Sequence, residues 1–214
     1  MTENKEMQSA ISMQALRRLP QYYSYLKLLE AEGIETISAP AIAKRMNLND
    51  VQVRKDLASV SLSGGKPKKG SNVHDLIRDI SHFLGYDNVR EAVLVGAGHL
   101  GSALLSYKGF EEYGMKVVAA FDNDPDCVGM KHFRDMIYPM QKLSNLCTRL
   151  NIRIGIITVP KHAAQEVCDA LILGGVQAIW NFAPTHLLVP KGIHVQNENM
   201  AVSLAVLSQY LIDV

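Results

Sequence analysis

The sequence predicts an α/β protein in two parts, a small helical part followed by a doubly wound parallel sheet. Three observations support this fold class. The first third of the chain contains short helical stretches with polar capping residues. After residue 85, apolar strands alternate with amphipathic helices, as in sheets that are covered by helices on both faces. The motif Gly-x-Gly-x-x-Gly stands between the first of these strands and its helix, at residues 96–101.

The composition is that of a globular protein rather than a membrane or secreted one. The chain has 214 residues, of which 48% are hydrophobic and 20% charged, enough for one large domain or two small ones. No apolar run approaches the roughly 18 residues that span a bilayer, and the polar N-terminus lacks the apolar stretch of a signal peptide. Cys127, Cys147 and Cys168 show neither CxxC nor Cys/His ligand spacing. We therefore expect a cytoplasmic protein with reduced thiols and no metal site.

The helical part is predicted to contain a helix-turn-helix. A first helix covers 19–33, with Pro20 in its first turn and Gly33 at its end. Ser38 caps a second helix, APAIAKRMN, and Asn49 caps a third, DVQVRKDLASV. A short Asn-Leu-Asn turn joins these two helices, which is the arrangement of a helix-turn-helix.

A segment rich in Gly, Ser, Lys and Pro, 61–72, follows the third helix and matches the wing of a winged helix. Residues 41–70 carry seven Lys or Arg against two Asp, whereas residues 81–214 carry ten against twelve Asp or Glu. This asymmetry favours a polyanion as the partner of the N-terminal part. A helical bundle with a solvated lysine run is the alternative.

The candidate DNA contacts lie on three pieces of the N-terminal part. Gln52, at the capping-box position of the third helix, and Arg54 can reach base edges, and Lys55 can reach phosphates. Lysines of the wing can enter a minor groove, and two arginines ahead of the first helix add phosphate contacts. The full set is Arg17, Arg18, Ser38, Gln52, Arg54, Lys55, Lys66, Lys68 and Lys69.

The rest of the chain alternates between helix and strand. The expected strands are continuous apolar runs, typical of a parallel sheet buried on both faces. They cover 92–98, 116–124, 152–160, 177–184 and 192–200. The expected helices cover 73–85, which Gly85 closes, and then 100–114, 140–151, 162–175 and a strongly apolar terminal segment, 200–214.

The glycine motif is in the setting that dinucleotide binding requires. Gly96 permits a tight turn, Gly98 lets the backbone approach a pyrophosphate, and Gly101 lets the helix pack on the sheet. The amides at the helix N-terminus suit an anion. Asp122 ends the second strand and can bond the ribose hydroxyls while repelling a 2′-phosphate, and Asn123 follows it. This favours NAD over NADP; a glycine turn without a ligand is the alternative.

No catalytic group is recognisable near this motif. Lys161, His162 and His186 follow strands, but none pairs with an orienting carboxylate. The segments TVP (158–160) and NFAP (181–184) form apolar walls that hold a nicotinamide without reacting with it. An NAD-dependent oxidoreductase is therefore the second hypothesis, supported by the glycine motif alone. The expected cofactor residues are Gly96, Ala97, Gly98, His99, Leu100, Gly101, Asp122, Asn123, Val159, Pro160, Asn181, Phe182, Ala183 and Pro184.

The order of motifs resembles the Rex family of redox-sensing transcriptional repressors over nearly the whole chain. The matching stretches are RLPQYYSYL (18–26), VRKDL (53–57), VGAGHLGSALLSYKGF (95–110), FDNDP (121–125), TVPKHAAQEVCDAL (158–171), GVQAIWNFAP (175–184) and NENMAVSLAVLS (197–208). VRKDL together with NFAP in one chain is specific to this family.

The resemblance implies three segments with separate roles. Residues 1–84 would form a winged-helix domain that binds a palindromic operator as a homodimer. Residues 85–198 would form a Rossmann domain that binds NADH or NAD⁺, and residues 199–214 a helix that swaps into the partner subunit. In the family, NADH closes the dimer and releases DNA, whereas NAD⁺ is compatible with DNA binding. That implies a repressor, not an enzyme.

The chain departs from the family pattern at positions that bear on DNA and redox response. Ala58, Ser59, Val60 and Ser61 replace the usual serine–aromatic–aromatic–glycine run, and the wing lacks its usual tyrosine. The family's linked switch of Arg, Tyr and Asp falls on Ser24, Tyr107 and Asn199 in this chain. Because a ligand shifts an equilibrium only through differential contacts, the alternative is a sister repressor with altered operator and a weakened or lost NADH response.

Overall fold

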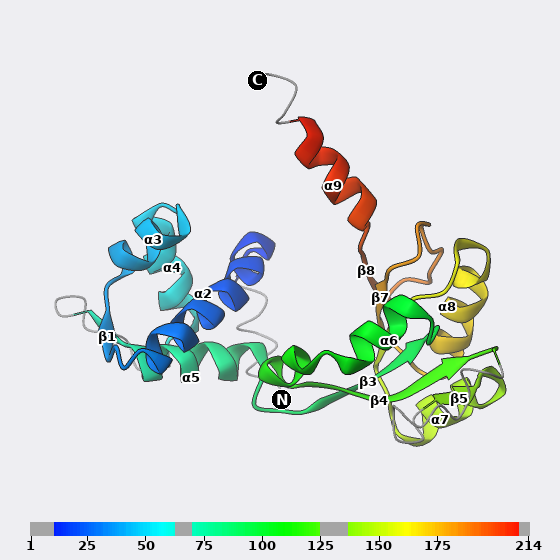
Figure 1. Ribbon diagram of the computed structural model, residues 1–214. Helices are drawn as coiled ribbons and strands as arrows, with labels where there is room; N and C mark the ends of the chain where they lie inside the picture. Colours follow the sequence, from blue (N-terminus) through cyan, green and yellow to red (C-terminus); the bar gives the residue numbers. More distant parts are fainter. Residues whose placement is uncertain (1–10, 63–69, 125–136, 210–214) are drawn as a thin grey trace. The chain divides into compact units, whose positions relative to one another are not determined.

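The computed structural model describes residues 11–62, 70–124 and 137–209, and the chain divides into two compact units, Met1–Asn88 and Val89–Val214 (Figure 1). The first unit is helical with a small antiparallel strand pair, and the second is built on a parallel sheet. The predicted fold class is therefore confirmed. The separate dimerisation segment at 199–214 stays a prediction.

The N-terminal unit surrounds one apolar core. Its fully buried side chains include Leu19, Tyr22, Leu26, Ile42 and Val53. The helices are α2 (Met13–Ala31), α3 (Ala39–Met46), α4 (Asp50–Val60) and α5 (Val73–Leu84), and the strands are β1 (Thr36–Ile37) and β2 (Ser71–Asn72), which pair antiparallel.

The predicted ends of the short helices are confirmed. Ser38 Oγ accepts a hydrogen bond from the Ala41 backbone N–H at 3.3 Å, and Asn49 Oδ1 accepts one from the Val51 N–H at 2.8 Å. Gly85 ends α5 with φ of +73°, the left-handed conformation that favours glycine. Gln52 does not complete the expected capping box, because its side chain lies against Arg18 instead.

The predicted start of the first helix is wrong. Helix α2 begins at Met13 with Ser12 as its N-cap, so Pro20 lies inside the helix and Arg17 and Arg18 are helical rather than ahead of it. An interior proline removes one backbone hydrogen bond and costs about 3 kcal/mol. Burial of Ala15 on the added turns offsets part of this cost.

The second unit contains a six-stranded parallel sheet in the order β5-β4-β3-β6-β7-β8. This is the strand order of the Rossmann fold, with the chain reversing direction across the sheet between β3 and β6. Ligands of such sheets bind at the carboxyl ends of the strands at this reversal point. The strands are β3 (Arg90–Val95), β4 (Met115–Asp122), β5 (Ile137–Pro139), β6 (Ile154–Ile157), β7 (Ala178–Asn181) and β8 (His194–Asn197).

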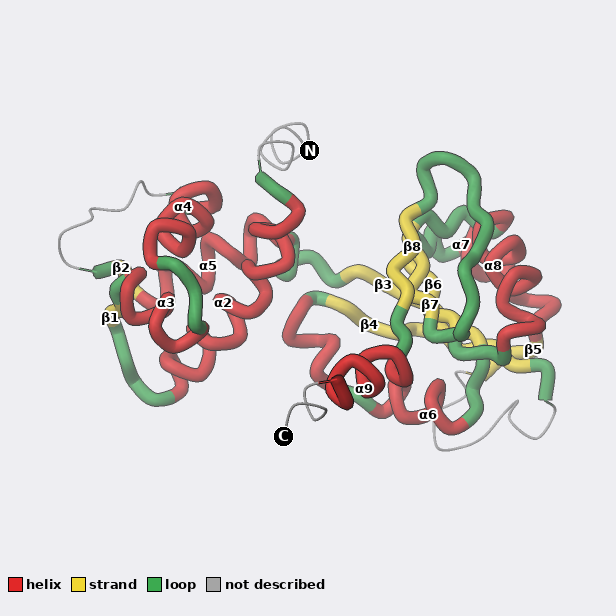
Figure 2. Tube along the Cα trace, turned by 90° about the horizontal axis from the view of Figure 1, so that it is seen from above, coloured by secondary structure: helices red, strands yellow, loops and turns green. Residues whose placement is uncertain are grey.

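Helices pack on both faces of the sheet (Figure 2). On one face, α7 (Leu143–Arg149) and α8 (Ala164–Leu173) bury Val93 and Val95 of β3. On the other face, α6 (His99–Ser106) packs over Ala92 and Leu94. The expected helix over 100–114 is wrong in extent, because it ends at Ser106 and a 3-10 helix, η1 (Lys108–Tyr113), follows the extended Tyr107.

The terminal helix α9 (Met200–Gln209) exposes large apolar side chains. Met200, Val202, Leu204, Val206 and Leu207 are each more than half exposed. Residues 210–214 of the predicted segment lie outside the described part of the chain. Among the described residues, no helix is both long and apolar enough to cross a membrane.

Candidate functional site

The glycine turn between β3 and α6 has the geometry of a nucleotide cradle. Gly96 has φ of +101°, and a Cβ on it would lie 2.9 Å from both the carbonyl carbon of Thr158 and Val159 Cγ1. A Cβ on Gly101 would lie 1.9 Å from the Gly96 oxygen, so only glycine lets the helix approach the turn this closely. A Cβ on Gly98 would meet nothing within 4 Å. The first and third glycines are thus required by the fold, whereas Gly98 faces open space.

Asp122 lies beside this turn. At the end of β4, its Oδ2 accepts a hydrogen bond from the Ala97 backbone N–H at 2.6 Å, and its Oδ1 accepts one from the Asp124 N–H at 2.8 Å. The carboxylate is therefore fixed next to the glycine turn, and Asn123 is exposed immediately after it. A negative group in this place suits the hydroxyls of a ribose and opposes a 2′-phosphate.

Thr158, which was not among the expected cofactor residues, also lies against the glycine turn. Its Oγ1 donates to the carbonyl oxygens of Val95 at 3.0 Å and Gly96 at 2.7 Å. This hydroxyl joins the carboxyl end of β6 to the glycine turn on the neighbouring strand. The only sequence signal for it was its place at the start of TVP.

The predicted wall residues of β6 and β7 meet the glycine turn at the same edge of the sheet. β3 pairs with β6, and β6 pairs with β7, all in parallel, so the segments after Val95, Ile157 and Asn181 lie side by side. Helix α6 opens with His99 and Leu100 at this edge. The topology therefore brings the segments that carry the expected cofactor residues to one edge of the sheet.

The buried side chain of Asn181 fixes the segment that follows β7 through hydrogen bonds to its backbone. Its side chain is fully buried, and its Nδ2 donates to the carbonyl oxygens of Ala183 at 3.2 Å and Thr185 at 2.9 Å. Its Oδ1 accepts a hydrogen bond from the Ala183 N–H at 3.0 Å. These contacts fold the chain back after β7 and leave Phe182 half-buried and Pro184 exposed. The amide that we expected to serve a nicotinamide is already engaged in the fold.

The basic side chains near this edge do not form a catalytic arrangement. Lys161 and His162 lie in a 3-10 turn, η4 (Lys161–Ala163), and both are exposed, as is His186. Within the described residues there is also no group of three His, Cys, Asp or Glu side chains that could hold a metal ion.

On the N-terminal unit, α4 presents a basic outer face. Arg54 and Lys55 are exposed, and Arg54 forms an ion pair with Asp50 one helical turn earlier. Ser38, a predicted DNA contact, is exposed at the start of α3 while it caps that helix. Exposed guanidinium and ammonium groups on the second helix of a helix-turn-helix are in position to contact a duplex.

The inner face of α4 is tied to α2 by a polar cluster. Arg18 Nε and Nη2 donate to the two oxygens of Asp56 at 2.8 and 3.0 Å, and Tyr22 Oη donates to Asp56 Oδ2 at 2.8 Å. The Gln52 amide oxygen, turned toward Arg18, accepts from its guanidinium at 3.0 and 3.1 Å. Burial, followed by the contact with Asp56, raises the pKa of Tyr22 to about 12. Arg18 is thus occupied within the fold, and Arg17 is exposed.

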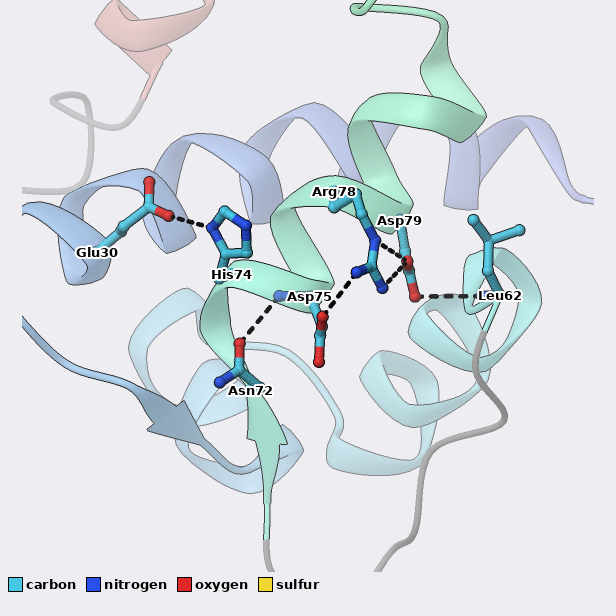
Figure 3. A network of polar contacts seen from close by, with 7 residues as sticks. All are labelled: Glu30, Leu62, Asn72, His74, Asp75, Arg78 and Asp79. Carbon is cyan, nitrogen blue, oxygen red and sulfur yellow. Dashed lines mark hydrogen bonds and ion pairs between the residues drawn. The ribbon is translucent and has the colours of Figure 1, made fainter.

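The base of the predicted wing is anchored to α5 (Figure 3). The Leu62 backbone N–H donates to Asp79 Oδ2 at 3.1 Å, and this buried carboxylate also accepts from Arg78 Nη2 at 3.1 Å. Asn72 caps α5 by accepting from the Asp75 N–H at 3.0 Å. Both ends of the wing segment are therefore held at the same helix. Lys66, Lys68 and Lys69 lie outside the described residues.

The three positions of the family switch lie in different settings. Ser24 is exposed on α2, and Tyr107 is 59% exposed with its ring edge-on to Phe110 at a centroid distance of 5.0 Å. Asn199 caps α9, because its Oδ1 accepts a hydrogen bond from the Val202 N–H at 3.0 Å. Asn199 therefore caps the helix and carries no charge.

Two of the three cysteines are buried inside the sheet domain. Burial raises the pKa of Cys147 and of Cys168 to about 11. Both thiols are free and packed in the core, Cys147 on α7 and Cys168 on α8, so at neutral pH they are protonated and unreactive. Cys127 lies outside the described residues.

Comparison with known proteins gives matches along the whole chain. Residues 87–185 match the family model described as "CoA binding domain", and residues 10–58 match the one described as "Putative DNA-binding protein N-terminus". The redox-sensing transcriptional repressor Rex of Porphyromonas gingivalis is 38% identical over 96% of this chain and 94% of its own length. The protein of the same name from Clostridium beijerinckii is 40% identical over 94% of this chain and 95% of its own.

Solved structures agree with these relatives. The fold is similar to RSP, a Rex-family repressor, in its complex with β-NAD⁺ and operator DNA, with a TM-score of 0.87 and 33% identity. That match covers 95% of this chain and 93% of the other. The complex of RSP with β-NADH matches with a TM-score of 0.84 and 34% identity, covering 95% of each chain.

Proposed function

This chain belongs to the Rex family of redox-sensing transcriptional repressors, and we propose that it binds operator DNA with its N-terminal unit and NADH or NAD⁺ at the carboxyl edge of its sheet. It is a repressor and not an enzyme, because the relatives that match nearly its whole length are named repressors. The earlier hypothesis of an NAD-dependent oxidoreductase is therefore wrong.

The glycine turn with Asp122 is the observation that carries the cofactor assignment. Gly98 leaves room where a dinucleotide pyrophosphate would lie, and the first turn of α6 offers backbone amides to its charge. Asp122 is fixed beside the turn, where it would bond the adenosine ribose. The residues present thus fit NAD(H), and RSP is solved with both of its redox states.

The outer face of α4 supports DNA binding. Arg54 and Lys55 are exposed there, and Asp56 fixes the opposite face of the helix to α2. We assign Arg54 to a base edge and Lys55 to phosphates. Lys66, Lys68 and Lys69 of the wing would add contacts from the segment that α5 anchors. Since the partner is chromosomal DNA in a bacterial family, we place the protein in the cytoplasm.

A homodimer on a palindromic operator is supported by two apolar surfaces. In the single chain, helix α9 exposes apolar side chains all round. A helix of this kind is stable in water only when a partner covers its apolar side chains. A groove of about 300 Å³ also opens on the sheet, lined by side chains such as Phe110, Met115, Val117, Ile156 and Trp180. A second copy that covers these surfaces would make a homodimer with two copies of α4, the number that a palindromic operator requires.

The direct test is an operator titration repeated without cofactor, with saturating NAD⁺ and with saturating NADH. We expect NADH to weaken operator binding and NAD⁺ to leave it intact. Equal affinities in all three conditions would identify the sister repressor without redox response, which Ser24 and Asn199 motivate. Fluorescence anisotropy of a labelled duplex measures the affinity, and an unrelated duplex is the control.

A further inference from the structure

Strand β7, which ends at the expected cofactor wall, is also hydrogen-bonded to the segment that leads into the C-terminal helix. Residues 197–199 comprise the last residue of β8 and the two residues that connect it to α9. The Glu198 backbone N–H donates to the Asn181 carbonyl oxygen at 2.8 Å, and Asn181 Nδ2 donates to Asn197 Oδ1 at 2.8 Å. The Trp180 indole Nε1–H donates to Glu198 Oε1 at 3.2 Å. Successive side chains of a strand point to opposite faces of the sheet. Trp180 and Asn181 of β7 therefore contact residues 197–199 from opposite faces.

Trp180 lies between the cofactor wall and Glu198. Its ring centroid is 4.5 Å from that of Phe182, with the two rings tilted by 57°. The Phe110 ring is edge-on to Trp180 at 5.9 Å. Distances of this size are those of aromatic pairs in direct contact. A displacement of Phe182 therefore has to be accommodated by Trp180, whose indole N–H is bonded to the residue before the cap of α9.

The two redox states of a nicotinamide differ in charge, and Phe182 is the aromatic side chain of the expected cofactor wall. The oxidised ring is a planar cation, which an aromatic face attracts, and the reduced ring is uncharged. Phe182 consequently has a different preferred position against each form. Packed side chains respond to such differences by switching between discrete arrangements rather than by deforming continuously.

We infer that the Trp180–Glu198 hydrogen bond couples the redox state of the bound nicotinamide to the position of α9. This inference rests on the proposed function, because it requires Phe182 to face the nicotinamide. It also gives a role to a carboxylate next to Asn199, where this chain lacks the family's acidic switch residue. Trp180 and Glu198 act as positioning residues. Gln196 supports them, because its Nε2 donates to the same Glu198 oxygen at 3.3 Å.

The test is the redox ratio, defined as the operator affinity with NAD⁺ divided by that with NADH. We expect Glu198→Ala, which removes the acceptor, and Trp180→Phe, which removes the donor but keeps a ring, each to lower this ratio at least about five-fold toward one. Glu198→Gln keeps an acceptor oxygen and should retain the ratio within about two-fold. The affinity for NADH, measured separately by calorimetry, should be unchanged in all three variants.

Gln165→Ala is the matched control. This substitution also removes hydrogen bonds within the same domain, those between the Gln165 side chain on α8 and the backbone of Leu188. Gln165 itself is not bonded to residues 197–199. The control should keep the wild-type ratio. The double variant of Trp180 and Glu198 should be no worse than either single one, because both remove the same bond.

Each other outcome has a distinct meaning. An unchanged ratio in both Glu198→Ala and Trp180→Phe would overturn the coupling and leave the proposed function standing. A wild-type ratio of one would overturn the proposed NADH response and the coupling with it. Weaker NADH binding in Glu198→Ala with an unchanged ratio would assign this residue to cofactor binding and also overturn the coupling. Should Trp180→Phe fail to fold, the comparison of the two Glu198 variants decides.

Discussion

Arg18 and Asp56 form a two-pronged ion pair across the helical core, with N–O distances of 2.8 and 3.0 Å between α2 and α4. Asp56 is only 6% exposed, and Tyr22 supplies a third hydrogen bond to it. The contact with Asp56 also raises the pKa of Arg18, so the guanidinium stays charged throughout the pH range of a cell. The helix that presents Arg54 and Lys55 is thus fixed by its inner face while its outer face stays open.

Loss of this pair should destabilise the N-terminal unit. Asp56→Ala would leave the Arg18 guanidinium, whose side chain is 16% exposed, without its carboxylate. We expect a loss of about 3 kcal/mol in the free energy of unfolding, measured by urea denaturation. Asp50→Ala on the same helix is the control. It breaks an ion pair with side chains 58% and 40% exposed, which should cost under about 1 kcal/mol.

The three glycines of the turn should respond differently to alanine. Gly101→Ala forces a Cβ against the Gly96 oxygen, and we expect the second unit to lose about 3 kcal/mol of stability. Gly98→Ala meets open space, so its unfolding curve should match the wild type while NADH affinity falls at least about ten-fold. Calorimetry and thermal denaturation separate the two effects. Wild-type NADH affinity in Gly98→Ala would show that the pyrophosphate lies elsewhere.

Asp122 should determine the choice between NADH and NADPH. The wild type is expected to prefer NADH by at least about ten-fold, because a carboxylate repels the 2′-phosphate. Asp122→Asn keeps an oxygen for the Ala97 N–H but loses the charge, so the preference should shrink while the turn is preserved. Parallel titrations with both nucleotides measure it. Equal wild-type affinities would remove the role that we give to Asp122.

Operator binding should weaken steeply with salt, because contacts to phosphates release counterions. Lys55→Ala should lower the slope of log K against log salt by about 0.9 and weaken different operator sequences alike. Lys191→Ala, which changes an exposed lysine in the other unit away from the apolar groove, should leave the slope unchanged. A flat salt dependence of the wild type would contradict the DNA interface.

The buried thiols should be inert in the folded protein. Since the pKa of Cys147 and Cys168 is raised from 9.0 to about 11, alkylation by iodoacetamide at pH 8 should label neither until denaturant is added. The raised pKa of the two thiols also makes the free energy of unfolding depend on pH. The stability that the two protonated thiols contribute is fully present below pH 9. It is lost as the pH rises toward 11, because the thiols of the unfolded chain ionise first. Peptide mass spectrometry identifies the labelled residues.

Local signals in the sequence were sufficient for most of the fold. Ser38, Asn49 and Gly85 mark helix ends through hydrogen bonds or backbone conformations that involve only near neighbours. The apolar runs and the glycine turn define the parallel sheet for the same reason. Pro20 misled the prediction of the first helix, because a rule for helix starts cannot take account of Ala15 and Leu19 packing into the core.

The parts that the sequence could not show depend on contacts between distant residues. Arg18 was expected at a phosphate, but it pairs with a carboxylate 38 positions away. Asn181 was expected to face the nicotinamide, whereas its amide holds the chain between Ala183 and Asn197. Strand β5 has three residues, too few for any periodicity to indicate it. In each case the partner is chosen by tertiary packing rather than by spacing along the chain.

The place of Trp180 has a practical consequence for optical measurement. It is the one tryptophan in the chain, and its ring touches Phe182. Dihydronicotinamide absorbs light in the band where indole emits, and the oxidised ring does not. A reduced cofactor beside Phe182 would therefore quench this single fluorophore by energy transfer, and an oxidised one would not. With a cofactor bound in this place, the molecule would carry an intrinsic reporter of nicotinamide oxidation, readable without any attached dye.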